Sequence, residues 1–116
     1  MTTHKGSCHC GSVTFELEGE FDHALACNCS ICSRRGTPLW FAPPERFRIG
    51  QPEAIVATYT FYRHAVKHRF CPTCGIHVFA EGSDAQGNSF VAVNIACIDG
   101  LDLSSIAIQE FDGKAL

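Results

Sequence analysis

Seven of the eight cysteines in this chain fall into three short groups, and their spacing constrains the fold more than any other feature. The groups are Cys8-x-Cys10, Cys27-x-Cys29-x-x-Cys32 and Cys71-x-x-Cys74. Cysteines spaced two or three residues apart are typical of zinc sites, in which each group contributes two or more thiolates to a tetrahedral ion. The sequence therefore predicts a fold whose distant segments are tied together by metal.

An even number of cysteines also suits a secreted protein held by disulfides. Residues 1–7 are polar, however, and lack the apolar stretch of a secretory signal. No run of about 18 apolar residues is present, so we expect no membrane-spanning helix and no membrane partner. These features indicate a cytoplasmic protein with reduced thiols, and they favour metal ligation over disulfides.

The composition indicates one globular domain over residues 1–116. Hydrophobic residues make up 46% of the chain and charged residues 18%, which excludes a disordered protein. The formal net charge of -3 argues against non-specific binding of nucleic acid, because such binding needs a basic face. A domain of this size gains stability from a bound metal.

Most of the sequence between the cysteines has the pattern of short strands separated by turns. Alternation of apolar and polar residues predicts a strand at 13–17. The only predicted helix is short, at 30–35, and ends at Gly36. Further strands are expected at 39–42, 55–62, 66–70, 76–80 and 90–96, with a turn at 81–88. The predicted class is mainly β, either a small open sheet or folded-over sheets tied by metal.

The two outer cysteine groups fit one closed site. On an extended chain Cys8 and Cys10 point to the same side. Pro72 and Gly75 favour a tight turn that directs Cys71 and Cys74 toward one ion. Four thiolates in two pairs make a closed structural zinc site, and we expect this zinc to stabilise the fold.

The middle group has three cysteines and no evident fourth partner. Cys27 and Cys29 can share one side of an extended segment, whereas Cys29 and Cys32 lie about one helical turn apart. A strand that runs into a short helix would bring the three sulfurs together. An open position beside three ligands is the pattern of a catalytic zinc, and a fourth protein ligand would make the site structural.

Several residues leave alternatives open. Cys97 could close the three-cysteine site, or it could be a small buried residue in phase with an apolar strand. His77 could be a ligand or a half-buried strand residue. His68 is a weak candidate for a general base. Trp40 and Phe41 fit either a pocket or the core. Arg48, Lys67 and Arg69 are predicted to be solvated strand positions.

Four segments of the chain are similar to those of one protein family. They are GSCHCGSV at 6–13, CNCSICSRR at 27–35, RFCPTCG at 69–75 and, more weakly, VNIACID at 93–99. This pattern resembles a short member of the glutathione-dependent formaldehyde-activating enzyme family, which includes centromere protein V-like proteins. The resemblance extends from residue 6 to about residue 100 and covers most of the chain.

The resemblance implies a β-tent fold, in which folded-over antiparallel sheets with one short helix are held by structural zinc. It implies two Zn²⁺ ions per chain: a structural zinc on Cys8, Cys10, Cys71 and Cys74, and a catalytic zinc on Cys27, Cys29 and Cys32. It further implies a carbon–sulfur lyase or synthase similar to S-hydroxymethylglutathione synthase. A small thiol, with glutathione as the candidate, would then bind at the open three-cysteine site.

Glutathione carries two carboxylates, which arginine binds bidentately. Arg34 and Arg35 follow the cysteines directly and are predicted substrate contacts, although cations at a helix C-terminus also complement its dipole. The competing interpretation is a non-catalytic, zinc-stabilised module that binds proteins or acts like a chaperone. The negative net charge disfavours nucleic acid as a partner but not a protein, and the sequence does not indicate an oligomeric state.

Overall fold

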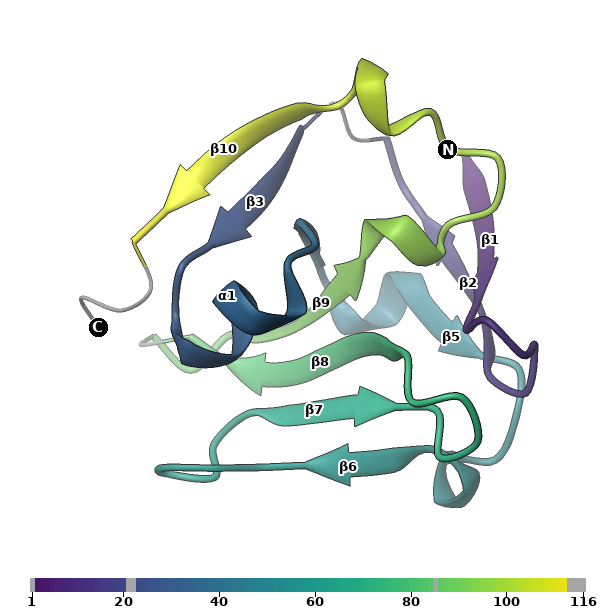
Figure 1. Ribbon diagram of the computed structural model, residues 1–116, viewed down its shortest axis with the longest axis horizontal. Helices are drawn as coiled ribbons and strands as arrows, with labels where there is room; N and C mark the ends of the chain where they lie inside the picture. Colours follow the sequence, from purple (N-terminus) through teal and green to yellow (C-terminus); the bar gives the residue numbers. More distant parts are fainter. Residues whose placement is uncertain (1, 21–22, 85, 113–116) are drawn as a thin grey trace.

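Short strands dominate the part of the chain that the computed structural model describes, which is residues 2–20, 23–84 and 86–112 (Figure 1). Within these ranges ten strands form two sheets, and the one α-helix is α1 (Ser30–Arg35). The prediction of a mainly β protein with one short helix is therefore confirmed. No helix in the described ranges has the length and apolar character needed to cross a bilayer.

The smaller sheet contains three antiparallel strands in the order β1-β2-β5. Its strands are β1 (Thr3–Ser7), β2 (Thr14–Glu18) and β5 (Phe47–Ile49). The alternation predicted at 13–17 is confirmed by β2, because Phe15 and Leu17 are buried and their neighbours Thr14 and Glu16 are only half-buried. This sheet presents its apolar face to the core, where the ring of Phe15 packs against Phe47 at 5.4 Å between centroids.

The larger sheet contains seven strands in the order β10-β3-β4-β9-β8-β7-β6. Neighbouring strands are antiparallel except at one edge, where β10 runs parallel to β3, so the expectation of purely antiparallel sheets is wrong there. Figure 1 shows this sheet running from β10 and β3 at the upper left to β6 at the bottom. The strands are β3 (His23–Cys27), β4 (Leu39–Ala42), β6 (Ala57–Tyr59), β7 (Lys67–Phe70), β8 (His77–Ser83), β9 (Ser89–Asn94) and β10 (Ala107–Phe111).

Three predicted strands differ clearly from the structure in where they begin or end. The strand expected at 90–96 ends at Asn94, because the Asn94 side chain accepts the Ala96 N–H at 3.1 Å and begins a 3₁₀ turn. The strand expected at 55–62 is only Ala57–Tyr59. Strand β8 continues to Ser83, into the turn expected at 81–88. Single 3₁₀ turns connect the elements: η1 (Pro44–Arg46), η2 (Glu53–Ile55), η3 (Ile95–Cys97) and η4 (Leu103–Ser105).

Both sheets contribute to one hydrophobic core. Its largest fully buried side chains include Leu17 from β2, Phe79 from β8 and Val93 from β9. Trp40 and Phe41 were each expected either in the core or in a pocket. Trp40 packs against the core. Phe41 is 40% exposed, and its ring contacts that of Phe90 at 5.2 Å between centroids. The core holds the two sheets in a fixed relation and so fixes where the cysteine-bearing loops meet.

The prediction that Arg69 is solvated is wrong, since its side chain is 3% exposed. Strand β7 has a strand on either side, and the consecutive residues His68 and Arg69 are both buried, so both faces of β7 are covered at this point. The guanidinium donates to Glu53 Oε1 at 2.9 Å, to Glu81 Oε2 at 3.0 Å and to the carbonyl of Val56 at 3.2 Å. Burial of this charge is therefore compensated by acceptors on several sides.

Candidate metal centres

The loop between β1 and β2 and the turn after β7 together form a cluster of four cysteines: Cys8, Cys10, Cys71 and Cys74. All four sulfur atoms lie within 4.8 Å of one another. The Sγ of Cys10 is 3.7 Å from that of Cys8 and 3.6 Å from that of Cys71. Sulfurs placed about 2.3 Å from a tetrahedral zinc would lie about 3.8 Å apart. The four-cysteine cluster therefore has the spacing that a zinc ion requires.

Backbone N–H groups point at these sulfurs. Val13 donates to Cys8 Sγ at 3.4 Å, and Thr73 donates to Cys71 Sγ at 3.3 Å. The turn after β7 closes because Gly75 adopts a φ of 80° and donates its N–H to the carbonyl of Cys71 at 2.9 Å. Hydrogen bonds from N–H groups favour the thiolate form, which is the form that binds metal.

The surroundings also shift the pKa values of these thiols. Hydrogen bonding from the backbone of Ile76 lowers the pKa of Cys74 to about 6. The Ser12 hydroxyl and backbone lower the pKa of Cys10, whereas burial raises that of Cys8. The lowered pKa of Cys74 favours its thiolate, which is the form that binds metal.

The eighth cysteine, Cys97, is not part of either cluster. It lies on η3, buried, with its Sγ 3.9 Å from the carbonyl oxygen of His77. Burial raises its pKa to about 11, and the nearby sulfurs of Cys8 and Cys74 contribute to that shift. Cys97 therefore lies on the side of the four-cysteine cluster, and the structure does not bring it to the other three cysteines.

The remaining cysteines form a three-cysteine cluster where β3 runs into α1. Cys27 ends β3, Cys29 precedes the helix, and Cys32 lies within it, with all three sulfurs within 4.8 Å of one another. The helix ends at Gly36, whose φ of 78° is left-handed and whose N–H donates to the carbonyl of Cys32 at 2.9 Å. This is the strand-to-helix geometry that the spacing predicted. Among the described residues, no further cysteine, histidine or carboxylate joins the group.

The surroundings shift the pKa values of Cys29 and Cys32 in opposite directions. Burial raises the pKa of Cys29, but the backbone N–H groups of Cys32 and Ile31 and the adjacent thiols outweigh burial, so the pKa is lowered. Burial and the hydrogen bond that the Cys32 S–H donates to Cys29 raise the pKa of Cys32 to about 12, and the charge of Arg35 opposes that rise. A thiol like Cys32 needs a cation beside it to become a ligand.

Arg35 supplies such a cation. Its Nη2 donates to Cys32 Sγ at 3.0 Å, and its Nη1 donates to His77 Nδ1 at 3.5 Å. Arg34 is exposed instead and donates to the carbonyl of Ser30 at 2.7 Å. The two arginines predicted to contact substrate thus point to different places, and only Arg35 contacts the three-cysteine cluster.

Two histidines of the larger sheet, His68 on β7 and His77 on β8, lie near Arg35. His68 is buried and His77 half-buried, with their ring centroids 5.8 Å apart. Burial, with the charges of Arg35 and His68, lowers the pKa of His77 to about 3. Burial and Arg35 also lower the pKa of His68. Both imidazoles are therefore neutral near pH 7, and neither is a ligand in the three-cysteine cluster.

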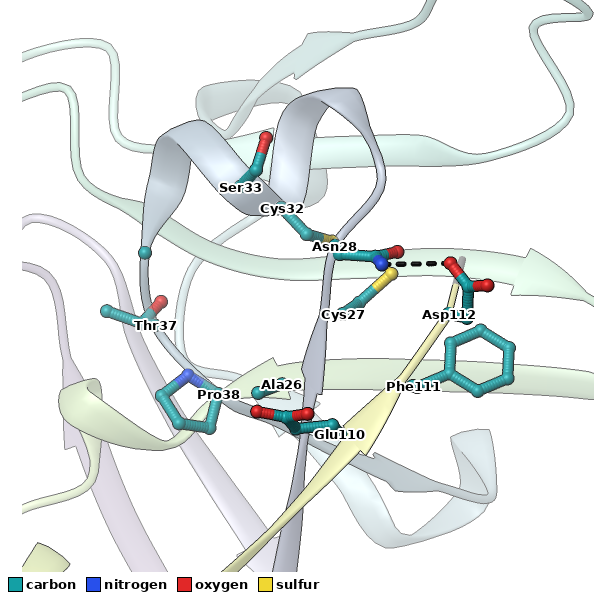
Figure 2. Close-up of a pocket in the computed structure, with 11 residues that line it drawn as sticks. Ala26, Cys27, Asn28, Cys32, Ser33, Thr37, Pro38, Glu110, Phe111 and Asp112 are labelled. Carbon is teal, nitrogen blue, oxygen red and sulfur yellow. Dashed lines mark hydrogen bonds between the residues drawn. The ribbon is translucent and has the colours of Figure 1, made fainter. Parts of the chain in front are cut away.

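A cleft of about 610 Å³ opens beside the three-cysteine cluster (Figure 2). Figure 2 shows the sulfur of Cys27 on the same side as the side chains of Asn28 and Asp112, where Asn28 Nδ2 donates to Asp112 Oδ1 at 2.8 Å. A second wall comes from the loop after α1. The residues that line the cleft are Ala26, Cys27, Asn28, Cys32, Ser33, Gly36, Thr37, Pro38, Glu110, Phe111 and Asp112.

Sequence reasoning missed three cleft residues at the C-terminal end of β10: Glu110 and Phe111 on the strand, and Asp112 directly after it. Strand β10 carries no apolar–polar alternation, because all five of its residues are exposed. Its parallel pairing with β3 places Phe111 opposite Cys27 and Glu110 opposite Ala26. Only this long-range pairing brings the carboxylates to the cysteines.

The chain is similar to a known protein family and to a protein of known structure. The family model described as glutathione-dependent formaldehyde-activating enzyme matches residues 3–111. The chain is also similar to a Rhodobacter sphaeroides protein whose crystal structure comes from a structural genomics programme. The two are 31% identical, with a TM-score of 0.76, and the match covers 90% of this chain and 99% of the other.

Proposed function

The chain belongs to the glutathione-dependent formaldehyde-activating enzyme family, and from this premise we propose that it is a zinc-dependent carbon–sulfur lyase or synthase. The proposal assigns one β-tent domain with two Zn²⁺ ions to the chain. Thiolate ligands need a reducing compartment, so the proposal includes a cytoplasmic location. The substrate is a small thiol that combines with formaldehyde or a similar carbonyl compound.

The four-cysteine cluster is assigned the structural zinc. Four sulfurs at tetrahedral spacing leave no position for a substrate, and closed sites of this kind are structural. The cluster ties the β1–β2 loop to the turn after β7, and so connects the smaller sheet to the larger one. Its role in the proposal is to hold the two sheets against the core.

The three-cysteine cluster is assigned the second, catalytic zinc. The observation that carries this assignment is the convergence of three sulfurs without a fourth ligand among the described residues, at the wall of a cleft. Three ligands and an open position are typical of catalytic zinc. When bound there, zinc would stabilise the thiolate form of a substrate thiol near neutral pH.

The reaction is balanced in both directions. In synthesis the thiol loses its proton, its sulfur electron pair forms a bond to the carbonyl carbon, and the carbonyl oxygen takes up a proton to become a hydroxyl. In the reverse direction the hydroxyl loses its proton, the carbon–oxygen double bond re-forms, and the carbon–sulfur bond breaks with its electron pair remaining on sulfur, which takes up a proton to become the thiol. The chain contributes apolar walls from Phe111 and Pro38, which limit water, and polar groups from Asn28 and Thr37, which can orient the hydroxyl.

The test is NMR exchange spectroscopy of formaldehyde with a thiol, measured with and without the zinc-loaded protein. Thiols add to formaldehyde without help, so the uncatalysed rate is the reference. Cys32→Ser, studied at equal total zinc, is the matched control because it removes one sulfur of the three-cysteine cluster. We expect acceleration by the native chain only. Equal rates in all samples, together with two zinc ions that no added thiol perturbs in X-ray absorption, would instead support the non-catalytic binding module.

A further inference from the structure

The described wall of the cleft beside the three-cysteine cluster is negatively charged. Glu110 and Asp112 line it, and among its described residues there is no lysine or arginine. Glu110 lies on β10 and Asp112 directly follows its last residue, and both line the cleft together with Cys27. Phe111, between them, is paired in register with Cys27, and one carboxylate therefore lies on either side of the position opposite this sulfur.

The carboxylate of Asp112 is also held in place. Its Oδ1 accepts the hydrogen bond from Asn28 Nδ2 at 2.8 Å, and Asn28 lies between Cys27 and Cys29 in the sequence. Figure 2 shows this pair bridging β10 and the segment that carries the cysteines. An oriented carboxylate thus lines the same cleft as Cys27.

The two arginines of helix α1 are not among the residues that line this cleft. Arg34 and Arg35 both line a separate cavity, formed with Ile76 and His77 on the other side of α1, and neither lines the cleft. Arg35 is engaged with Cys32 and His77, and Arg34 with the carbonyl of Ser30. The two arginines that the sequence predicts as contacts for the carboxylates of glutathione are therefore not part of the described wall of this cleft.

We propose that the thiol accepted here carries an ammonium group and no carboxylate, that is, a small aminothiol. This inference rests on the proposed function, because it specifies which thiol occupies the open position of the three-cysteine cluster. The carboxylates of glutathione would face those of Glu110 and Asp112, whereas an ammonium group two carbons from the sulfur would be attracted to them. Both carboxylates are exposed, so we expect a preference on the order of five- to tenfold at low salt.

The experiment is a titration of the cobalt(II)-loaded protein with three small thiols, followed by the ligand-field absorption of the metal. Cysteamine is the cationic thiol, 2-mercaptoethanol the neutral one and 3-mercaptopropionate the anionic one. Their sulfurs differ in intrinsic basicity, so a ratio is compared between proteins. For each protein, the Kd of 3-mercaptopropionate is divided by the Kd of cysteamine. The deciding quantity is this ratio in the native chain divided by the same ratio in Glu110→Gln/Asp112→Asn. The basicity term cancels in this cycle.

We expect the double substitution to reduce the preference for cysteamine about fivefold, and 0.5 M salt to reduce it in the native chain. Glu45→Gln is the matched control, since Glu45 is an exposed carboxylate on η1 that does not line the cleft. A cycle ratio near one, or tighter binding of the anionic thiol by the native chain, would overturn this inference alone. If no thiol changes the cobalt spectrum, the open site itself is wrong and the proposed function fails with it.

Discussion

The guanidinium of Arg35 lies against the sulfur of Cys32, with Nη2 donating to Sγ at 3.0 Å. Burial holds the pKa of Cys32 at about 12, and the positive charge of Arg35 acts against that effect. The contact makes Arg35 a positioning residue for the three-cysteine cluster. Its charge favours the thiolate form of the buried sulfur and so opposes the effect of burial, and its contact with His77 connects the helix to β8.

Arg35→Gln is expected to weaken metal binding at the three-cysteine cluster by 10- to 100-fold, the usual cost of losing a hydrogen bond to a metal ligand. Competition with a chromophoric chelator measures the affinity of each site. Arg34→Gln is the matched control, because the neighbouring Arg34 side chain is exposed and donates to the carbonyl of Ser30. Equal losses in the two variants would show that net charge, and not the contact with Cys32, controls affinity.

Cys71→Ser and Cys32→Ser should have different consequences. Cys71 is fully buried in the four-cysteine cluster, and structural zinc contributes about 10–16 kcal/mol in small domains, which exceeds the stability of most folded chains. We expect Cys71→Ser to lose its near-UV circular dichroism and its cooperative thermal transition. Cys32→Ser should keep both and lose one zinc by metal analysis. Unfolding of both variants would mean that the three-cysteine cluster is structural as well.

The two ion-paired arginines of the sheets should differ strongly in their effect on stability. Arg69 is 3% exposed and Arg48 is 53% exposed, although each contacts two glutamates. Arg69→Ala also leaves the carbonyls of Glu53 and Val56 without their donor, and we expect a loss of about 2–4 kcal/mol. Arg48→Ala should cost under about 1 kcal/mol. Urea unfolding of both variants tests the difference, and similar losses would contradict it.

The sequence was most informative where sulfur directions depend on local geometry alone. A spacing of two on an extended chain and of three on a helical turn determines which sulfurs converge, and both clusters have the predicted members. Strand β2 and helix α1 were predictable for the same reason, because alternation at Phe15 and Leu17 and the terminating Gly36 are local signals.

The parts that sequence reasoning missed depend on long-range pairing. Strand β10 is exposed along its length and has no periodic pattern, so its placement beside β3, and with it Glu110 and Asp112 in the cleft, required the tertiary structure. Strands β1 and β5 were missed too, being short or without clean alternation, and only the end of β3 that leads into α1 was expected. Arg69 was misjudged because its burial depends on acceptors at Glu53 and Val56, which lie in another segment.

His77 makes the folding stability depend on pH. Its pKa is about 3 in the folded protein against an ordinary value of 6.5, so the unfolded chain binds more protons between these values. The resulting stability is fully present above pH 6.5 and is lost as the pH falls. One such group corresponds to about 1.4 kcal/mol between pH 7.5 and 5.5, and the lowered pKa of His68 acts in the same direction.

Urea unfolding of the zinc-loaded native chain and of His77→Gln at pH 7.5 and 5.5 tests this dependence. The loss of stability on acidification should be smaller in the variant by about 1 kcal/mol. Protonation of the cysteine ligands affects both proteins alike and cancels in the difference. An identical loss in the two proteins would show that His77 does not titrate in this range.

Cys97 provides the sharpest test of whether the three-cysteine cluster is closed by the eighth cysteine. Burial raises its pKa to about 11, so the thiol is protonated at neutral pH, and its Sγ lies near the carbonyl of His77 and away from Cys27, Cys29 and Cys32. Cys97→Ala should therefore retain both zinc ions and lose only about 1 kcal/mol of stability from a small buried cavity. Cys74→Ala, which removes a sulfur from the four-cysteine cluster, is the control and should lose a zinc ion. Loss of one zinc from Cys97→Ala in metal analysis would identify Cys97 as a ligand and would refute the open site.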